Sequence, residues 1–301
     1  MNSRSQKKRQ LINLIEARVK SATKSLISKL FGLTRKGVYW KSNGEAKDEL
    51  LKNQIIDCLA INPSYGHRRL ALALGVGKKR VRRVMKLYGI KPYKRKARWT
   101  KKRDKGKPDS GLPNLIKGSC PIRPKVVYVG DFTRLSWNGK IIYLATFMDL
   151  FTREIVGWSI STRHTYDLIQ NAFKEALTYF GKSIIVHTDQ GSEYTSKEYL
   201  KLMGSLEVKI SMSKKGSPWE NGFQESFYDN FKTDLGLEFE RFEGVGEFVE
   251  GVHKTINYYN NQRIHLALKT SPTKFRQNFV STSETVCTKR GTGQFLKMRD
   301  W

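Results

Sequence analysis

The stretch Ile184-Ile185-Val186-His187-Thr188-Asp189-Gln190-Gly191 sets an acid at the end of a short apolar run. A run of this length between Gly181 and Gly191 is typical of a buried strand. The sequence therefore predicts that Asp189 lies at the carboxyl-terminal edge of a strand. We interpret His187 as a packed residue of the same strand.

A second acid lies in a predicted helix. Thirty-five residues separate Asp189 from Glu225. After Pro218, large apolar residues recur at four-residue steps, at Phe223, Phe227, Phe231 and Leu235. This spacing is typical of an amphipathic helix. Asn221 and Lys232 fall on about the same face of that helix as Glu225.

A third acid, Asp131, lies in the middle of the apolar run Lys125-Val126-Val127-Tyr128-Val129-Gly130-Asp131-Phe132-Thr133. This run predicts a strand that continues to about Trp137, where Asn138-Gly139 is a strong signal for a two-residue hairpin. Further strands are predicted over residues 140–149, 154–161 and 208–212, and helices over residues 166–180 and 196–204.

The predicted order is three antiparallel strands, then helix, strand, helix, strand and helix. This is the order of the ribonuclease-H-like fold, so the expected class is α/β, with a mixed sheet of three antiparallel strands followed by two parallel ones. In that fold the first and fourth strands are neighbours, which brings Asp131 beside Asp189. Asp149, which precedes Phe151-Thr152-Arg153, is interpreted as the residue that fixes that turn.

Charge and composition narrow the partners. The 301 residues carry a formal net charge of +29, and the pI is near 10, which favours a polyanion as partner. No apolar run approaches the roughly 20 residues that cross a bilayer, and the basic N-terminus lacks a signal-peptide apolar region, so we expect nucleic acid and no membrane. Three scattered cysteines indicate neither a disulfide framework nor a zinc knuckle, and a reducing cytosol fits.

Most of the charge lies in the first third of the chain, where residues 1–110 hold about 31 Lys and Arg against about 7 Asp and Glu. Residues 1–45 are expected to be basic and helical, forming either a helix-turn-helix that reads DNA or a plain helical prop. Residues 46–90 are expected to form a second helix-turn-helix. The apolar face predicted for its first helix consists of Leu50, Leu51, Ile55, Ile56 and Leu59.

The last helix of this second module is the strongest candidate for DNA contact. Apolar residues repeat there at helical spacing, at Val81, Val84, Met85 and Tyr88. A basic helix that is seated by such a stripe can enter a major groove, and a solvated charged face is the alternative. The candidate DNA contacts on it are Lys79, Arg80, Arg82, Arg83 and Lys86.

Residues 91–122 are expected to form a basic arm and a linker. In the arm, basic residues would follow DNA phosphates, unless the segment is a disordered tether. The arm residues expected to do so are Lys94, Arg95, Lys96 and Arg98. A catalytic core is expected over residues 123–280, and a tail over residues 281–301.

The three acids select a metal. Carboxylates without a cluster of His or Cys favour a hard cation, with Mg²⁺ or Mn²⁺ as the natural occupants. Two such ions about 3.5–4 Å apart hold the attacking and leaving oxygens of an in-line displacement at a phosphodiester. We expect Asp131 to bridge two ions, and Asp189 and Glu225 each to complete the shell of one.

The core motifs resemble a known family. Asp131-Phe132-Thr133, His187 through Ser192 with Tyr194, and Ser213 through Phe227 are similar to the retroviral-integrase-type core of bacterial insertion-sequence transposases with a DDE triad. The spacing of thirty-five residues is the one for which this family is named. Two positions depart from its pattern. Glu220 stands where Asp is usual, and Glu193 stands where Gln is often found.

The flanking motifs resemble the same family. Tyr65-Gly66-His67-Arg68-Arg69 and Arg80 through Met85 are similar to the helix-turn-helix before the core in the insertion-sequence-three type, the OrfB part. Tyr259 through His265 is similar to the closing motif of that type.

The resemblance implies that Asp131, Asp189 and Glu225 are the catalytic and metal-binding acids. It implies further DNA contacts at Lys214, Lys215, Asn221 and Lys232. The implied activity is transposition, in which the protein binds inverted-repeat ends, nicks to expose a 3′-hydroxyl and attacks target DNA. A homo-oligomer on double-stranded DNA in the bacterial cytoplasm is expected, as is fusion or partnership with an OrfA-type protein from an upstream reading frame.

Three other classes of protein share part of this pattern. A retroviral-type integrase would carry a His-His-Cys-Cys zinc module before the core, and a plain ribonuclease H would need no basic N-terminal third. The remaining alternative is a domesticated transposase that occupies end sequences as a repressor. The presence of all three acids argues against it.

Overall fold

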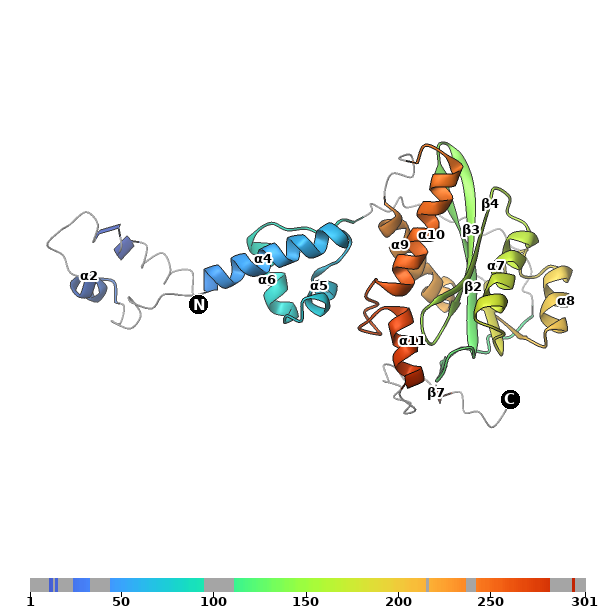
Figure 1. The fold of residues 1–301 in the computed structure, drawn as a ribbon. Coiled ribbons are helices and arrows are strands. Elements are labelled where there is room, and N and C mark those ends of the chain that lie inside the picture. Colours follow the sequence, from blue (N-terminus) through green and yellow to red (C-terminus); the bar gives the residue numbers. More distant parts are fainter. Residues whose placement is uncertain are drawn as a thin grey trace. The chain divides into compact units, whose positions relative to one another are not determined.

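The computed structural model describes residues 11–12, 14–15, 24–32, 44–94, 111–214, 217–236, 242–281 and 294–295. By compactness the chain divides into two units, residues 1–54 and residues 55–301. Figure 1 labels their elements. Within the described ranges, no helix combines the length and the apolar character needed to span a bilayer.

The N-terminal region contains helix α2 (Lys24–Leu30) and helix α4 (Gly44–Ile61). Of the segment 1–45, which was expected to be helical, residues 1–10, 13, 16–23 and 33–43 lie outside the described residues. On α4, Leu51 is buried, whereas Leu50 is 66% exposed and Ile56 46% exposed. The predicted apolar face was therefore too wide. Successive residues of an α-helix point about 100° apart, so neighbours such as Leu50 and Leu51 cannot share one narrow stripe.

Two short helices follow, α5 (His67–Ala73) and α6 (Lys78–Leu87). They are joined by a turn in which Gly75 has a φ of +64°, a conformation that glycine adopts without strain. The predicted apolar stripe of α6 is buried at Val81, Val84 and Met85. The basic side chains of α6 are exposed on the remaining surface of the helix.

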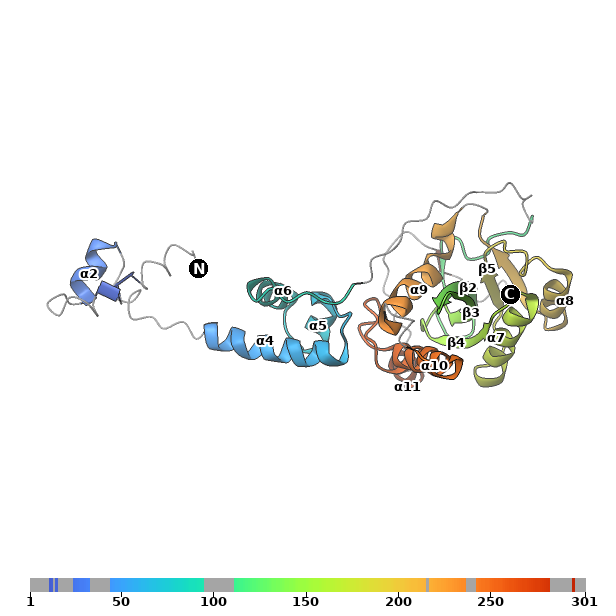
Figure 2. The ribbon, with the colours of Figure 1, turned by 90° about the horizontal axis from the view of Figure 1, so that it is seen from above.

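A five-stranded sheet forms the centre of the second unit (Figure 2). Its strands are β2 (Val127–Trp137), β3 (Lys140–Asp149), β4 (Ile155–Ser161), β5 (Ile185–Thr188) and β6 (Lys209–Met212). Their order across the sheet is β4-β3-β2-β5-β6; β2, β3 and β4 pair antiparallel, and β5 and β6 are added in parallel. This order confirms the predicted ribonuclease-H-like sheet.

The hairpin between β2 and β3 was also predicted correctly. Asn138 and Gly139 both have positive φ, 45° and 70°. A two-residue turn of type I′ requires positive φ at both central residues, and its twist matches that of the flanking strands.

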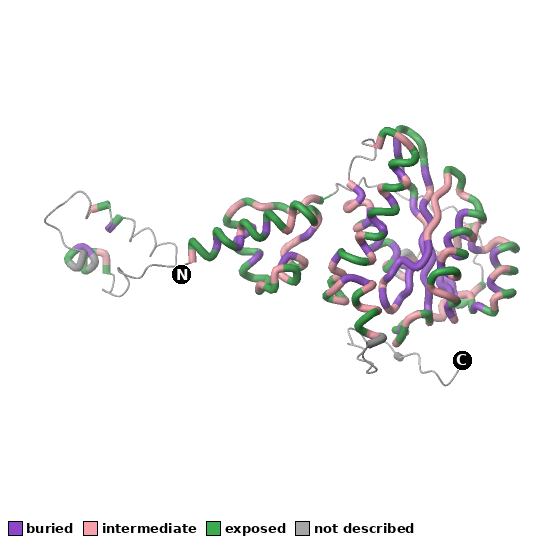
Figure 3. Tube along the Cα trace, in the orientation of Figure 1, coloured by how far each residue is buried: buried purple, intermediate pink, exposed green. Residues whose placement is uncertain are grey.

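Helices cover both faces of the sheet (Figure 2). One face is covered by α7 (Tyr166–Tyr179) and α8 (Lys197–Ser205), and the other by α9 (Gly222–Leu235) and α10 (Val245–Asn261), with α11 (Pro272–Ser281) packed beside α10. Successive side chains of β3 point to opposite faces of the sheet and so contribute to the cores on both sides. Ala145 and Phe147 join the cluster under α7, while Leu144 and Met148 join the cluster under α9. Burial is accordingly concentrated along the strands (Figure 3).

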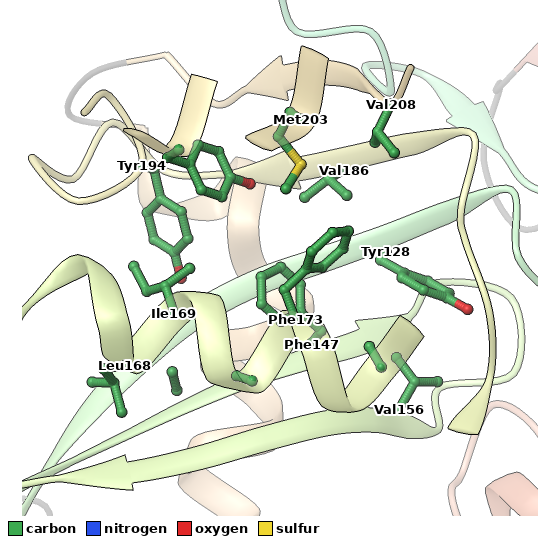
Figure 4. Close-up of a cluster of buried hydrophobic side chains, with 14 of the residues drawn as sticks. Tyr128, Phe147, Val156, Leu168, Ile169, Phe173, Val186, Tyr194, Met203 and Val208 are labelled. Carbon is green, nitrogen blue, oxygen red and sulfur yellow. The ribbon is translucent and has the colours of Figure 1, made fainter. Parts of the chain in front are cut away.

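Helix α7 rests directly on β4 at Gly157. A Cβ on this residue would lie 2.2 Å from the Ala172 carbonyl oxygen and 2.6 Å from the Ala176 nitrogen. Both are backbone atoms of α7, so the helix could not accommodate a side chain without shifting. Around this contact Phe173, Phe147 and neighbouring side chains fill the core (Figure 4).

The helix predicted after Pro218 divides into a single 3-10 turn, η1 (Pro218–Asn221), and α9. The apolar stripe holds from Phe227 onward, but Phe223 is 42% exposed. The guanidinium of Arg153 instead lies over the Phe223 ring, 4.1 Å from its centroid. The buried stripe of α9 therefore begins at Phe227.

Two smaller features complete the description. Strand β1 (Ser119–Cys120) pairs in parallel with β7 (Gln294–Phe295) in the otherwise undescribed tail. Asp149 fixes the turn after β3, as predicted. Its Oδ1 accepts hydrogen bonds from the backbone N–H groups of Phe151 and Thr152 at 3.0 and 2.8 Å.

A buried polar seam joins the segment around α5 to the closing motif. Arg263, which is 2% exposed, forms an ion pair with Asp234. Across the seam, Arg69 donates to the Ile264 carbonyl at 3.0 Å, and the Ile264 N–H donates to the Tyr65 hydroxyl at 2.8 Å. The motif that precedes the core therefore contacts the closing motif near the end of the core.

Replacing Arg263 with Met should destabilise the folded chain by about 3–5 kcal/mol, because Asp234 would then remain as a buried charge without its partner. Urea unfolding of the full chain measures the loss. The double variant Arg263→Met, Asp234→Leu should be more stable than the sum of the single losses predicts. Additive losses would contradict the coupling. Lys254→Ala, at an exposed ion pair, is the control and should leave the unfolding midpoint unchanged.

His265 gives the stability a dependence on pH. Burial, and next the positive charges of Arg153, Arg263 and Arg69, lower the pKa of His265 from 6.5 to about 4. The folded chain thus binds this proton less readily than the unfolded chain. The stability that depends on neutral His265 is complete above pH 6.5 and is lost as the pH falls toward 4.

The variant His265→Gln should therefore have a flatter acid limb. Between pH 6.5 and 4, the slope of unfolding free energy against pH should be lower than in the original chain by up to about 1.4 kcal/mol per pH unit. Urea unfolding at several pH values measures this slope. Identical slopes in the two proteins would show that His265 protonates equally in both states.

Candidate active site

The pairing of β2 with β5 sets two of the predicted acids at the same level. The parallel ladder aligns Val129 with His187. Asp131 and Asp189 each follow two residues later, so they lie level on neighbouring chains beyond the last ladder pair. Asp131 is half-buried within β2, and Asp189 is half-buried just past the end of β5.

Local hydrogen bonds orient both carboxylates. Asp131 Oδ1 accepts from the N–H of Phe132 at 2.8 Å. Asp189 Oδ1 accepts from the N–H of Gly191 at 3.0 Å, which closes a tight turn after β5. Each acid thus has one oxygen engaged by its own backbone.

The charges of both acids affect the pKa values of two buried tyrosines. Burial raises the pKa of Tyr194 well above its usual value, and the negative charges of Asp131 and then Asp189 raise it further. Burial and the same two charges also raise the pKa of Tyr228. Since both hydroxyls feel both carboxylates, Asp131 and Asp189 share one electrostatic environment. The Tyr194 hydroxyl is enclosed and has no hydrogen-bond partner among the described residues.

Two side chains fix α9 against β2 on either side of Glu225. Gln224 is fully buried and donates from Nε2 to the Val129 carbonyl at 2.5 Å. The Tyr228 hydroxyl donates to the Asp131 carbonyl at 2.6 Å. The backbone of Glu225 is therefore held beside the strand that carries Asp131, while its side chain is exposed.

The three acids do not form a closed ligand set. In the part of the chain that the structure describes, no three His, Cys, Asp or Glu side chains are gathered closely enough to hold a metal ion. The structure thus places Asp131 in β2 level with Asp189 just past the end of β5, and leaves the side chain of Glu225 exposed on the adjacent helix.

His187 is a packed strand residue, as interpreted from the sequence. It is fully buried, and its Nδ1 lies 2.8 Å from Ser211 Oγ, which accepts in turn from the N–H of Leu115 at 2.9 Å. Burial lowers the pKa of His187 to about 4. His187 therefore links β5 to β6 and to the segment before β2.

Glu220 orders the loop that leads into α9. Its Oε2 accepts from the Lys214 N–H at 2.7 Å and from the Asn114 side chain at 2.9 Å. These hydrogen bonds, led by that of Lys214, and the nearby charge of Lys117 lower the pKa of Glu220. The departure from the family pattern at this position therefore has a structural role.

The predicted DNA contacts are dispersed. On α6 the basic side chains are exposed, at Lys79, Arg80, Arg82, Arg83 and Lys86. Lys94 and Lys214 are also exposed, Lys232 is half-buried on α9, and Asn221 is only 5% exposed. Four further candidates lie outside the described residues, namely Arg95, Lys96, Arg98 and Lys215.

Sequence reasoning missed Gln224, Tyr228 and Asn114. Gln224 and Tyr228 are four residues apart on α9, so they share one helical face. A pair of hydrogen-bonding residues within an otherwise apolar stripe was the signal for a helix that caps strand carbonyls. No local pattern indicates Asn114, whose partner Glu220 lies 106 residues away.

Comparisons with known proteins point to one family. Residues 121–218 and 206–272 match two families that are each described as an integrase core domain. The transposase for insertion sequence element IS904 from Lactococcus lactis is 37% identical over 198 residues, which are 63% of this chain and 76% of the relative. The IS600 31 kDa protein from Shigella sonnei, described as uncharacterized, is 32% identical over 83% of this chain and 97% of its own length.

Among solved structures, the HTLV-2 integrase catalytic core domain, solved in complex with magnesium, aligns with 52% of this chain and 99% of its own length, at 18% identity and a TM-score of 0.43. The transposase InsF for insertion sequence IS3A from Escherichia coli is 35% identical over 113 residues, 37% of this chain and 39% of the relative. With relatives above 30% identity that are matched over most of their length, the chain belongs to the IS3-type insertion-sequence transposases, the OrfB-like proteins with an integrase core domain.

Proposed function

We propose that this transposase cleaves and joins DNA at the ends of an insertion sequence, with Asp131, Asp189 and Glu225 as the acids that act at the phosphodiester. The observation that carries the proposal is the parallel register of β2 and β5, which sets Asp131 in β2 level with Asp189 just past the end of β5. The shared influence of these two acids on Tyr194 and Tyr228 supports it.

The chemistry of the donors fits a hard divalent cation. Asp131 and Asp189 offer carboxylate oxygens at the same level of neighbouring strands. Mg²⁺ and Mn²⁺ prefer such ligands, and two bound ions would activate the attacking oxygen and stabilise the leaving one. Glu225 would join this set when its exposed side chain turns from α9 toward β2.

The surrounding residues would keep the acids in register during the reaction. Tyr228 holds the Asp131 carbonyl and Gln224 holds the Val129 carbonyl, so α9 need not move for Glu225 to reach β2. A preorganised set of charges spares the reorganisation that water would require. The group attacked would be a DNA phosphodiester. The attacking group would be water in cleavage and a 3′-hydroxyl in strand transfer.

For recognition of the element ends, we propose that α6 enters the major groove. Its buried apolar stripe fixes the helix while Lys79, Arg82 and Lys86 remain exposed on the outer surface. Arg80 and Arg83 would add to this surface, and the arm after α6 would follow the phosphates. Asn221 would shape the start of α9 and would not touch DNA, because it is buried.

We propose further that the chain acts as a homo-oligomer on DNA. Joining two element ends to one target requires two reacting strands, which one acid site cannot hold together. In this proposal residues 46–90 bind the ends, residues 91–122 connect, and residues 123–280 catalyse. An OrfA-type partner from an upstream frame would add further DNA-binding surface.

Replacing Asp131 or Asp189 with Asn, or Glu225 with Gln, should lower the rate of metal-dependent nicking of end DNA by at least about a thousandfold, or about 4 kcal/mol. DNA binding should persist, because the proposed binding surface lies elsewhere. Asp229→Asn, which removes an exposed acid one turn further along α9, is the matched control. Retained nicking in any triad variant would reject that residue, and binding without any nicking by the original chain would favour the repressor alternative.

Changing Arg82 and Arg83 together to Ala should weaken binding to end DNA more than binding to unrelated DNA. Base contacts discriminate between sequences, whereas phosphate contacts do not. Each lost phosphate contact would also reduce the slope of log affinity against log salt by about 0.9. The control, Lys197→Ala with Lys201→Ala, removes equal charge from exposed positions of α8. Equal weakening on both DNAs would show that the arginines contact phosphates alone.

A further inference from the structure

We propose that His164 and Glu193 are positioning residues, which form a clasp between the turn that carries Asp189 and the strand that carries Asp131. The effect of this clasp on metal binding rests on the proposed function, whereas the clasp itself rests on geometry alone. Glu193 is one of the two positions at which the chain departs from the family pattern. Its carboxylate has a specific partner in the fold.

His164 is held between two aromatic rings of the sheet. It lies between β4 and α7, with its ring centroid 3.9 Å from that of Phe132 and 5.1 Å from that of Tyr143. The ring stacks on Tyr143 with an interplanar angle of 27°. Phe132 directly follows Asp131 in β2, so the position of His164 is coupled to the strand that carries the first acid.

The other end of the contact lies in the turn after β5. His164 Nδ1 lies 3.0 Å from Glu193 Oε1, with 27% and 10% of the two side chains exposed. His164 Nε2 is enclosed and has no hydrogen-bond partner among the described residues, so the ring proton belongs on Nδ1, where the carboxylate accepts it. The Ser192 hydroxyl donates to the same Oε1 at 2.9 Å.

The second oxygen of Glu193 lies beside Gly191, as does the carboxylate of Asp189. A Cβ on Gly191 would lie 3.2 Å from Glu193 Oε2 and 3.1 Å from Asp189 Oδ1, so both carboxylates flank Gly191 on the same side. Two negative charges in such proximity repel each other. His164 and Ser192 bind the other oxygen of Glu193, Oε1, and thereby hold its carboxylate in place in this turn.

The clasp lies beyond the end of the hydrogen-bonded ladder between β2 and β5. The ladder between β2 and β5 ends at Val129 and His187, before either acid. Beyond that point, the contacts from Phe132 through His164 to Glu193 connect β2 with the turn after β5. The distance between Asp131 and Asp189 is therefore set by this path as well as by the strand pairing.

Hydrogen exchange of the full metal-free chain tests the clasp itself. His164→Ala should speed amide exchange in peptides covering residues 189–196 by about tenfold, the factor expected for one lost hydrogen bond to a charged group. His253→Ala removes a histidine ring stacked on Trp158, with centroids 6.0 Å apart, and is the matched control that should leave these peptides unchanged. Unchanged exchange in His164→Ala would overturn the clasp, whatever the metal does.

Titration of Mn²⁺ into the same proteins, followed by calorimetry, tests the positioning role. His164→Ala and Glu193→Ala should each raise the Kd for Mn²⁺ by about tenfold, and the double variant should bind no more weakly than either single variant. Glu193→Gln keeps an oxygen that accepts from His164, and should recover most of the affinity. Unchanged Kd values would overturn the positioning role even where exchange is faster.

The two proposals fail in different ways. If the original chain binds no Mn²⁺, or if Asp189→Asn binds it equally well, the proposed metal site is wrong and the positioning role falls with it. The exchange measurement still decides whether the clasp exists. Thermal unfolding of each variant identifies a general loss of structure, which would speed exchange across the whole core and not only at residues 189–196.

Discussion

The parallel pairing of β2 with β5 is the constraint on which the rest of the structure depends. Two parallel neighbours cannot be joined by a tight turn, so the chain must cross over the sheet, and α7 provides that crossover. The pairing also fixes the level of everything that follows either strand. Asp131 and Asp189 lie 58 positions apart in sequence, and they meet because Val129 and His187, separated by the same number, are ladder partners.

The second requirement is that α9, from later in the chain, lies beside β2. Polar contacts fix it there. Apolar packing of Phe227 and Phe231 holds α9 on the sheet, but the hydrophobic effect has no preferred direction. Hydrogen bonds from Gln224 and Tyr228 to strand carbonyls are directional, so they fix the height of the helix. Their burial makes each bond costly to break, since a carbonyl left without a donor would remain desolvated.

The sequence allowed the sheet, the hairpin, the stripe of α6 and the role of Asp149 to be predicted, because each has a local pattern. Strands show as apolar runs, Asn138-Gly139 shows as a turn, and Asp149 bonds to residues that follow it directly. Where local patterns conflict, prediction failed. Leu50 is 66% exposed because it points about 100° away from the buried Leu51, and Phe223 is 42% exposed although its spacing fits the stripe.

The remaining contacts have no local pattern at all. Arg69 bonds to Ile264 across 195 positions, and Tyr228 bonds to Asp131 across 97. For the candidate site, residue types and spacing sufficed to choose three acids. They did not indicate that Glu225 would have its side chain in solvent, nor that His164 would approach the turn after β5.

The contact of α7 with Gly157 has a consequence for comparing relatives. Here the helix backbone touches the sheet backbone, so a methyl group at this position must lift α7 from the sheet or tilt it. The size of the residue at this position therefore indicates the distance between α7 and the sheet. A relative with alanine or a larger residue there should compensate with bulkier side chains where this chain has Ala172 and Ala176, and the thickness of that layer can be anticipated before any coordinates exist.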